Sequence, residues 1–265
     1  MQVVIVPTPA EVGRLAAAKI GHLVRGRPDT VLGLATGSSP LAIYAELARQ
    51  VAEEGLDCSQ VRAFALDEYV GLPPEHPESY RSVLMRDVVE PLGMDPSNVH
   101  VPDGSAADVA AACEAYEAQI AETGPVALQI LGIGANGHIG FNEPTSSFAS
   151  RTRIKTLAPQ TRADNARFFD SPEQVPTHCL TQGLGTILDA TTLVLVAQGE
   201  TKADAVAKMV EGPVSSMCPG SALQLHRDAN VIVDEAAASR LTLADYYRYT
   251  FANRPAWQRF ETPRG

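Results

Sequence analysis

The stretch TTLVLVAQG at residues 191–199 consists almost entirely of apolar and β-branched residues until it ends in Gln198 and Gly199. A strand whose successive residues are all apolar is typical of a mainly parallel sheet, because helices cover both of its faces. Similar runs recur along the whole chain. They are VVIVP at 3–7, TVLGLA at 30–35, VRAFALD at 61–67, ALQILGIG at 127–134 and ANVIVDEAA at 229–237.

Between these runs, apolar residues recur at helical spacing. Alternation of strand and helix predicts an α/β fold with an open, mainly parallel, Rossmann-like sheet and helices on both faces. Ligands of such sheets gather at the carboxyl ends of the strands. The predicted helices cover residues 12–23, 41–54, 105–122, 202–210 and 241–249.

No repeat, low-complexity tract or linker-like stretch divides the chain, so we expect residues 1–265 to form a single domain. Residues 141–180 show no clear strand and carry many Arg, Thr and Phe residues. We interpret this region as a lid excursion from the core domain.

The formal charge of -10 argues against nucleic acid or an anionic membrane surface as a partner. The first residues, MQVVIVPTPAEVG, do not resemble a signal peptide, and no apolar run reaches the roughly 18 residues of a membrane span. The four cysteines lack CxxC spacing, which favours reduced thiols over a zinc site. We therefore expect a cytoplasmic protein without a metal.

The loop LATGSSP at 34–40 lies between a predicted strand and a predicted helix. Gly37 lets the backbone approach a ligand closely, and Ser38 and Ser39 add hydroxyl donors at a helix N-terminus, which suits a phosphate. The loop lacks the lysine of a P-loop. A tight turn in which a serine only caps the helix is the alternative.

The segment LDEYVGL at 66–72 follows the third apolar run and presents two adjacent carboxylates, Asp67 and Glu68. Neighbouring residues of a strand point to opposite faces, so we expect one carboxylate to face a ligand and the other to orient the loop. A carboxylate whose pKa is raised by burial suits proton transfer. An acidic residue that merely ends a strand is the alternative.

The segment GANGHIGFNEP at 134–144 is rich in glycine but does not match the GxGxxG spacing of a dinucleotide loop. It holds His138 close to the Glu143 carboxylate, which could fix the imidazole tautomer and raise its basicity. An inert loop histidine is the alternative. Among the basic residues, Lys202 follows the strand at 191–199 and so belongs to the same edge of the sheet, whereas most arginines of the 141–180 region read equally well as a solvated face.

Taken together, these motifs resemble the glucosamine-6-phosphate deaminase family, the isomerase-deaminases of amino-sugar (N-acetylglucosamine) catabolism. The matching segments span most of residues 30–235 in the expected order. They are LGLATGSSP, FALDEYVGLPPEHPESY, GIGANGHIGFNEP, SSFASRTRIKTL, ARFFD, LTQGLGTILDA and SALQLH.

The resemblance implies a hydrolase that converts glucosamine-6-phosphate and water to fructose-6-phosphate and ammonia, without a metal or an organic cofactor. It implies that Asp67 moves the proton between C2 and C1, that His138 assists ring opening and that Glu143 orients His138. It also implies that Gly37, Ser38 and Ser39 bind the phosphate with Arg167 and Lys202.

One catalytic position departs from some family members, which carry Asp where this chain has Asn136. An amide can hydrogen-bond but cannot take a proton, so the acid/base role falls on His138 and Glu143 and the pH optimum could differ. Other members also carry Asn there.

The resemblance leaves regulation open. Some members bind the activator N-acetylglucosamine-6-phosphate at subunit interfaces of a homo-oligomer, a hexamer in some cases. The matching positions are Ser146, Arg153, Lys155 and Thr156, which on the alternative interpretation only support the lid. Two rival functions also stay open: a 6-phosphogluconolactonase-like hydrolase, and a sugar-phosphate sensor domain of the kind fused to DNA-binding modules.

Overall fold

The main sheet of the described residues has seven strands in the order β1-β10-β9-β6-β2-β3-β5, and its neighbouring strands pair in parallel. A computed structural model of the protein describes residues 1–255, 258 and 260–261. The predicted mainly parallel α/β sheet is confirmed. Its strands are β1 (Gln2–Val6), β2 (Val31–Leu34), β3 (Arg62–Ala65), β5 (Val99–His100), β6 (Leu128–Leu131), β9 (Thr192–Ala197) and β10 (Ala229–Asp234).

The apolar runs of the sequence form the centre of this sheet. Every residue of β6, β9 and β10 is buried, which explains why these strands do not alternate between apolar and polar residues. Each fully buried aliphatic side chain contributes roughly 1.5–3 kcal/mol, so the central strands dominate the stability of the fold.

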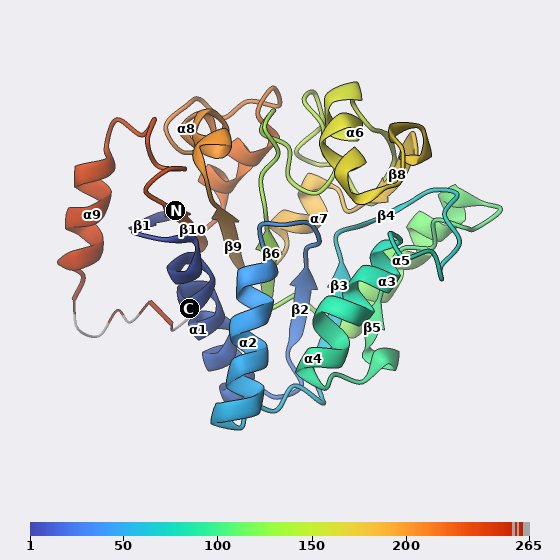
Figure 1. Cartoon of the computed structure of the whole chain (residues 1–265), viewed down its shortest axis with the longest axis horizontal. Coiled ribbons are helices and arrows are strands. Elements are labelled where there is room, and N and C mark those ends of the chain that lie inside the picture. The colour runs from blue at the N-terminus through green and yellow to red at the C-terminus, as the bar shows by residue number, and fades with distance from the viewer. Residues whose placement is uncertain (256–257, 259, 262–265) are drawn as a thin grey trace.

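Helices cover both faces of the sheet. Figure 1 shows α1 (Pro9–Gly26) and α2 (Leu41–Glu54) in front of the strands, and α5 (Val109–Thr123) behind them. Helix α1 begins where Thr8 accepts a hydrogen bond from the Glu11 amide. The other helices are α3 (Tyr80–Leu84), α4 (Glu90–Leu92), α6 (Pro159–Asn165), α7 (Leu184–Leu188), α8 (Ala203–Val210) and α9 (Ala244–Ala252). Shorter helical turns are η1 (Met85–Val89), η2 (Pro96–Asn98), η3 (Ala166–Phe168), η4 (Pro172–Gln174), η5 (Glu200–Lys202) and η6 (Pro219–Leu225).

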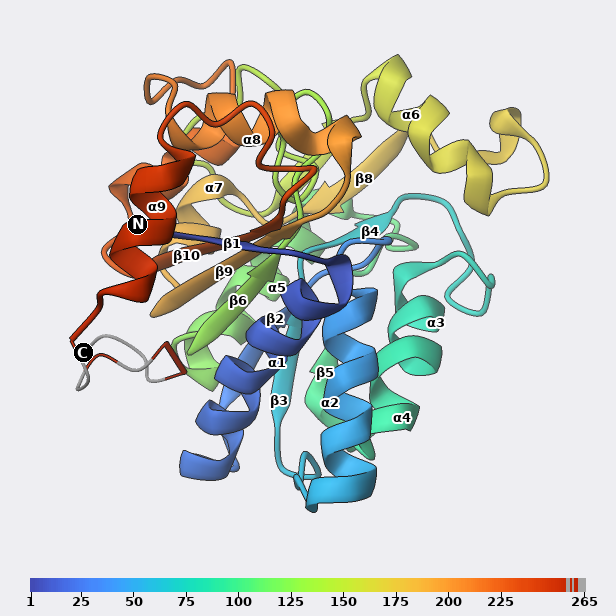
Figure 2. The same ribbon diagram turned by 60° about the vertical axis from the view of Figure 1, so that its left-hand side comes forward.

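A second, antiparallel sheet corrects the interpretation of residues 141–180 as a region without strands. It consists of β4 (Asp67–Tyr69), β8 (His178–Thr181) and β7 (Arg153–Thr156), in that order. Strand β7 reads RIKT and lacks an apolar run, so its sequence carries no strand signal. Figure 2 shows α6 standing above β8 and β4, away from α1 and α2.

The same sheet shifts one predicted boundary that matters for function. The strand predicted over 61–67 leaves the main sheet after Ala65, and Asp67 is the first residue of β4. The Gln182 amide group nevertheless ties the two sheets together, because its Nε2 donates to the Ala65 carbonyl at 2.9 Å. Asp67 therefore stands at the junction between the two sheets.

Three predicted helices begin later than expected. The helix predicted over 105–122 starts at Val109, because Asp108 caps it by accepting from the Ala111 amide, while Ser105 is held in a turn by Asp103. The helices predicted over 202–210 and 241–249 are α8 and α9, which start at Ala203 and Ala244.

The close packing of α1 against α2 can be tested by substituting a glycine at their contact. A Cβ added at Gly13 would lie 2.5 Å from the Ala42 carbonyl oxygen, which belongs to the backbone and cannot easily give way. We expect Gly13→Ala to lower the free energy of unfolding in urea by roughly 1–3 kcal/mol. Gly26→Ala on the same helix is the control, since nothing lies within 4 Å of the added Cβ. It should raise stability by up to about 1 kcal/mol, and an equal loss in both variants would contradict the packing argument.

Candidate active site

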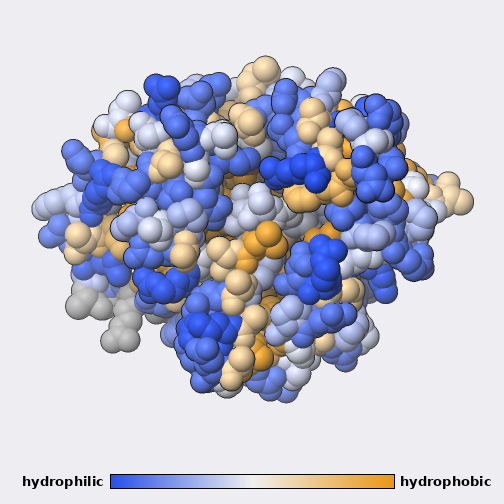
Figure 3. Space-filling model, in the orientation of Figure 1, coloured by the Kyte–Doolittle hydropathy of each residue, from blue (hydrophilic) through white to orange (hydrophobic). Residues whose placement is uncertain are grey.

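A pocket of about 480 Å³ opens at the carboxyl ends of β2, β3, β6 and β9. Its floor comes from the loops that follow these strands, and its roof comes from α6 and η3. Figure 3 shows the mostly hydrophilic face that carries it, with less polar atoms toward the hollow centre. The residues that line it include Gly37, Ser38, Ser39, Asp67, Tyr80, Ile133, Gly134, His138, Thr161, Asn165, Arg167, Phe168 and Lys202.

One end of the pocket is suited to an anion. Gly37 adopts a positive φ of 85°, which glycine tolerates and which turns the loop toward the first turn of α2. Helix α2 begins after Pro40 without a side-chain cap, so the alternative of a serine that only caps this helix is wrong. The Ser38 hydroxyl instead accepts a hydrogen bond from the Arg167 guanidinium at 3.3 Å.

Lys202 reaches the same end from the turn after β9. Its Nζ donates to the Ile133 carbonyl oxygen at 2.7 Å, so the lysine joins the anion-binding end to the glycine-rich loop. Burial lowers the pKa of Lys202 and the nearby Arg167 acts in the same direction, although the Asp164 carboxylate opposes both. The five residues predicted to bind phosphate thus line one pocket.

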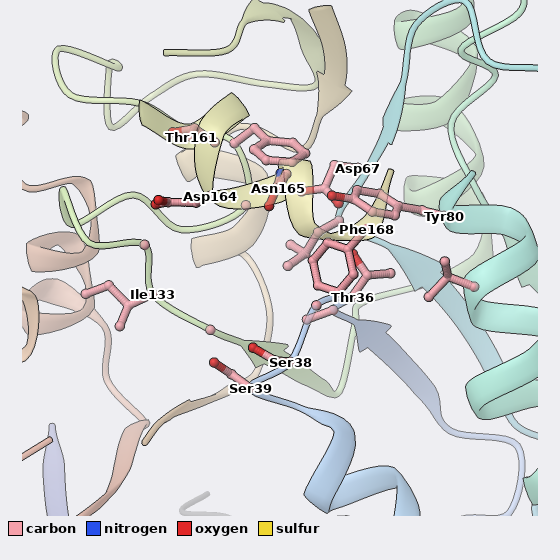
Figure 4. A pocket seen from close by; sticks show the side chains of 18 of the residues that line it. Thr36, Ser38, Ser39, Asp67, Tyr80, Ile133, Thr161, Asp164, Asn165 and Phe168 are labelled. Carbon is pink, nitrogen blue, oxygen red and sulfur yellow. The ribbon is translucent and has the colours of Figure 1, made fainter. Parts of the chain in front are cut away.

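The two adjacent carboxylates of β4 have different surroundings, as strand alternation predicts. Asp67 lines the pocket, and its side chain accepts no hydrogen bond from any described residue. Glu68 instead accepts hydrogen bonds from the backbone amides of Tyr69, Tyr80 and Arg81 at 2.7–2.9 Å. Figure 4 shows Asp67 and Tyr80 on one side of the pocket and Ser38 and Ser39 at the opposite end.

The protonation of Asp67 follows from this environment. Burial raises its pKa well above the usual range, and the neighbouring Glu68 charge adds to the effect. A carboxyl group whose ionised form is this unfavourable is a strong base when it is ionised, which suits the removal of a proton from carbon.

His138 is linked to Glu143 through the amide of Asn136. The Asn136 Nδ2 donates to Glu143 Oε2 at 2.6 Å, and the Asn136 Oδ1 lies 2.7 Å from His138 Nδ1. The direct separation of His138 Nδ1 from Glu143 Oε2 is 3.7 Å, too long for a hydrogen bond. Because a carboxylate only accepts, the amide nitrogen must face Glu143. The neutral imidazole in this arrangement therefore carries its hydrogen on Nδ1 and its lone pair on Nε2.

Two local features hold this arrangement. A Cβ added at Gly134 would lie 2.1 Å from the imidazole Cε1, so the ring of His138 lies directly against that glycine. Burial acts to raise the pKa of Glu143, but the His138 imidazole, the Thr161 hydroxyl and the Asn136 amide outweigh it and lower the pKa to about 2. Glu143 is therefore ionised throughout the neutral range.

Three lining residues were not predicted as site residues, although Tyr80 and Phe168 lie within the segments that resemble the family. Tyr80, Asn165 and Phe168 line the pocket, and Asn165 Nδ2 donates to the Tyr69 hydroxyl at 3.0 Å. They come from short helices whose polar sequence shows no clear periodicity. Conversely, the four positions matched to an activator site, Ser146, Arg153, Lys155 and Thr156, do not line this pocket. Ser146 is buried and donates to the Glu143 carbonyl, and the other three belong to β7.

Within residues 1–255, 258 and 260–261, no group of three or more His, Cys, Asp or Glu side chains could hold a metal ion. No helix in that part of the chain is long and apolar enough to cross a membrane.

The fold and site define an α/β protein with one pocket at the carboxyl edge of a parallel sheet, in which a cationic, hydroxyl-rich end faces an end with a buried carboxyl group and a histidine. The chain belongs to the family of glucosamine-6-phosphate isomerases and 6-phosphogluconolactonases, whose sequence pattern matches residues 8–233. The resemblance inferred from the motifs is therefore confirmed.

Individual relatives sharpen the comparison. A glucosamine-6-phosphate deaminase of Streptomyces coelicolor is 62% identical over 97% of this chain and 99% of its own. A solved structure of a monomeric glucosamine-6-phosphate deaminase is 42% identical, with a TM-score of 0.89 over 91% of this chain and 100% of that chain. The 6-phosphogluconolactonase of Trypanosoma cruzi is 20% identical, with a TM-score of 0.71 over 91% of this chain and 97% of its own, and so shares the fold alone.

The burial of Asp67 predicts that its ionised form destabilises the folded protein at neutral pH. Because burial raises its pKa in the folded state, the protonated form stabilises the fold at low pH. That contribution is lost as the pH rises from the unfolded value of about 3.9 through the raised folded value. At neutral pH, Asp67→Asn should therefore raise the Tm by roughly 2–4 °C, or about 1 kcal/mol, in a thermal melt followed by circular dichroism.

The neighbouring carboxylate is the matched control for this melt. Burial raises the pKa of Glu68 as well, but Glu68→Gln should still lower the Tm. The side chain accepts three backbone hydrogen bonds through both oxygens, and the amide nitrogen of Gln cannot accept in place of one of them. A lower Tm for Asp67→Asn at neutral pH would refute the assignment of an unfavourable buried charge.

Proposed function

We propose that this protein converts glucosamine-6-phosphate and water to fructose-6-phosphate and ammonia, an aldose–ketose isomerisation coupled to deamination. The proposal rests on one observation: a single pocket has a cationic, hydroxyl-rich end and also contains the buried Asp67 carboxyl group and His138. The tautomer of that histidine is set by Asn136. The identity of 62% with a glucosamine-6-phosphate deaminase over nearly the whole chain supports the same reaction.

The phosphate end supplies binding and orientation. Backbone amides at the start of α2, the hydroxyls of Ser38 and Ser39, and the cations Arg167 and Lys202 neutralise the phosphate dianion. With the phosphate fixed, C1 and C2 of the sugar extend toward Asp67 and His138. Such positioning converts proton transfer into an intramolecular step.

Ring opening is the first chemical step. His138 Nε2 takes the proton of the hydroxyl at C1 while the bond from C1 to the ring oxygen breaks, and the proton returns to that oxygen. Asn136 keeps the neutral imidazole in the required tautomer, since its carbonyl oxygen accepts from Nδ1. The ionised Glu143 stabilises the imidazolium that forms for a moment.

Isomerisation and deamination follow on the open chain. Ionised Asp67 removes the proton from C2 while the C1 carbonyl oxygen takes a proton from the substrate's ammonium group, so that an enolamine forms between C1 and C2. Asp67 then returns its proton to C1, and the C2–N bond becomes an iminium. Water then adds to the imine carbon at C2, and the C2–N bond breaks to release ammonia. No electron is gained or lost overall, so the balance needs no redox partner.

The remaining predictions belong to this proposal. We place the protein in the cytoplasm, in amino-sugar catabolism, as a single domain whose 141–180 region acts as a lid. A homo-oligomer and an activator site at Ser146, Arg153, Lys155 and Thr156 stay predictions. The monomeric state of a relative that is 42% identical shows that the fold itself does not require assembly.

Ammonia release separates the proposed function from its two rivals. The protein should release ammonia from glucosamine-6-phosphate in a coupled assay, whereas a lactonase would hydrolyse a phosphosugar lactone instead and a sensor would bind without turnover. Asp67→Asn should reduce ammonia release by a factor of about 10³ or more, because the enolisation base is lost. It should also abolish solvent-deuterium exchange at C2 while substrate binding survives. Lactone hydrolysis without ammonia release by the wild-type protein would refute the proposal.

The role of His138 is tested by comparing two substrates. If His138 acts in ring opening, His138→Gln should slow the cyclic substrate by a factor of about 10² or more. An open-chain analogue that lacks the hydroxyl at C5 cannot close a pyranose ring, and its C2 deuterium exchange should change little. Equal losses on both substrates would assign a different role to the imidazole.

A further inference from the structure

Helix α6 holds the Glu143 carboxylate by the oxygen that faces away from His138. The Thr161 hydroxyl donates to Glu143 Oε1 at 2.6 Å, and the Ala158 amide donates to the same oxygen at 3.2 Å. Thr161 is 4% exposed and Glu143 is 6% exposed, so water competes little for this hydrogen bond. A charge-assisted hydrogen bond in such surroundings is short and strong.

The other carboxylate oxygen continues the chain to the imidazole. Glu143 Oε2 accepts from Asn136 Nδ2 at 2.6 Å, and Asn136 Oδ1 lies 2.7 Å from His138 Nδ1. Thr161, Glu143, Asn136 and His138 therefore form one continuous hydrogen-bonded chain. If the Glu143 carboxylate rotated, the Asn136 amide would turn with it, and the His138 imidazole would turn in consequence.

The same short helix also reaches the ligand pocket. Asn165, at the end of α6, and Arg167, in the following turn η3, both line it. Arg167 donates to the Ser38 hydroxyl of the anion-binding loop. Figure 4 shows Thr161 and Asn165 on the same ribbon segment above the pocket. Residues 158–168 thus connect the anion-binding end of the site with the carboxylate behind His138.

We propose that Thr161 is a positioning residue for ring opening, which sets the orientation of His138 through Glu143 and Asn136 and makes that orientation depend on the placement of α6. This inference rests on the proposed function, because it concerns the histidine of the same site. An anion that draws Arg167 and Ser38 together holds α6 in the position at which Thr161 donates to Glu143. Through α6, which forms the roof of the pocket, phosphate binding is thereby coupled to the orientation of His138.

A purely structural hydroxyl would look similar, and the chain contains a matched example. Thr186 is also buried, and its hydroxyl donates to the Glu117 carboxylate at 2.6 Å. Glu117 and Thr186 do not line the pocket. Thr161→Val and Thr186→Val therefore remove the same kind of hydrogen bond at two places, of which one alone is connected to His138.

The experiment measures kcat and KM for ammonia release and C2 deuterium exchange with the open-chain analogue. We expect Thr161→Val to lower kcat on glucosamine-6-phosphate by a factor of about ten or more, since a hydrogen bond to a charged group is lost. The KM and the exchange rate of the open-chain analogue should stay within about twofold, because ring opening alone is affected. Thr161→Ser keeps the hydroxyl and should recover most of the rate, while Thr186→Val should match the wild-type protein.

A double-mutant cycle tests whether Thr161 acts through Glu143. In the Glu143→Gln background, Thr161→Val should have little further effect on kcat. If Thr161→Val does not fold, Thr161→Cys takes its place, because a thiol is a weak donor of similar size. Equal losses on both substrates, independent effects in the cycle, or a wild-type rate for Thr161→Val would each overturn the inference. Absence of ammonia release in the wild-type protein would instead overturn the proposed function.

Discussion

Parallel pairing of the strands in the main sheet is the constraint on which the rest of the structure depends. Because β2, β3, β6 and β9 run in the same direction, their carboxyl ends meet at one edge, and the loops that follow them must share the space above it. Segments more than 150 residues apart in sequence, such as Ser38 and Lys202, thereby line one pocket. The buried apolar strands supply the stability that allows these loops to carry polar groups.

The departure of the chain from the main sheet after β3 determines how the acid/base end is built. Strand β4 pairs with β8 in a different sheet, so Asp67 and Glu68 fall at a junction and experience different surroundings. Glu68 is satisfied by three backbone amides and fixes the path of the chain toward α3. Burial raises the pKa of both carboxyl groups, but the backbone amides oppose the effect at Glu68, whereas Asp67 receives no comparable donor from the described residues and its pKa lies well above the usual range. One carboxylate holds the loop through the backbone, and the other lines the pocket with a raised pKa.

An amide at position 136 fits this site better than a second carboxylate would. Asn136 donates to Glu143 through its nitrogen and accepts from His138 through its oxygen, so one side chain satisfies both neighbours. An aspartate there could not donate to Glu143 unless it were protonated, and two ionised carboxylates so close together would repel each other. The difference from family members with Asp at this position therefore leaves the link to His138 intact. The pKa of Glu143 is lowered to about 2 chiefly by the His138 imidazole and the Thr161 hydroxyl, and the Asn136 amide adds to their effect.

The sequence by itself determined the α/β class, the parallel sheet and the loops at its carboxyl edge, because continuous apolar runs and glycine-rich turns are local patterns. The loop motifs also identified Asp67, His138 and the anion-binding residues as candidates, and the family is confirmed by the match over 8–233. Only the tertiary structure decided that β7 and β8 exist, since RIKT gains its strand conformation from pairing and not from burial. Likewise, the donor from Thr161 to Glu143 joins residues 18 positions apart through the placement of α6. Such contacts depend on packing between elements, and no local periodicity records them.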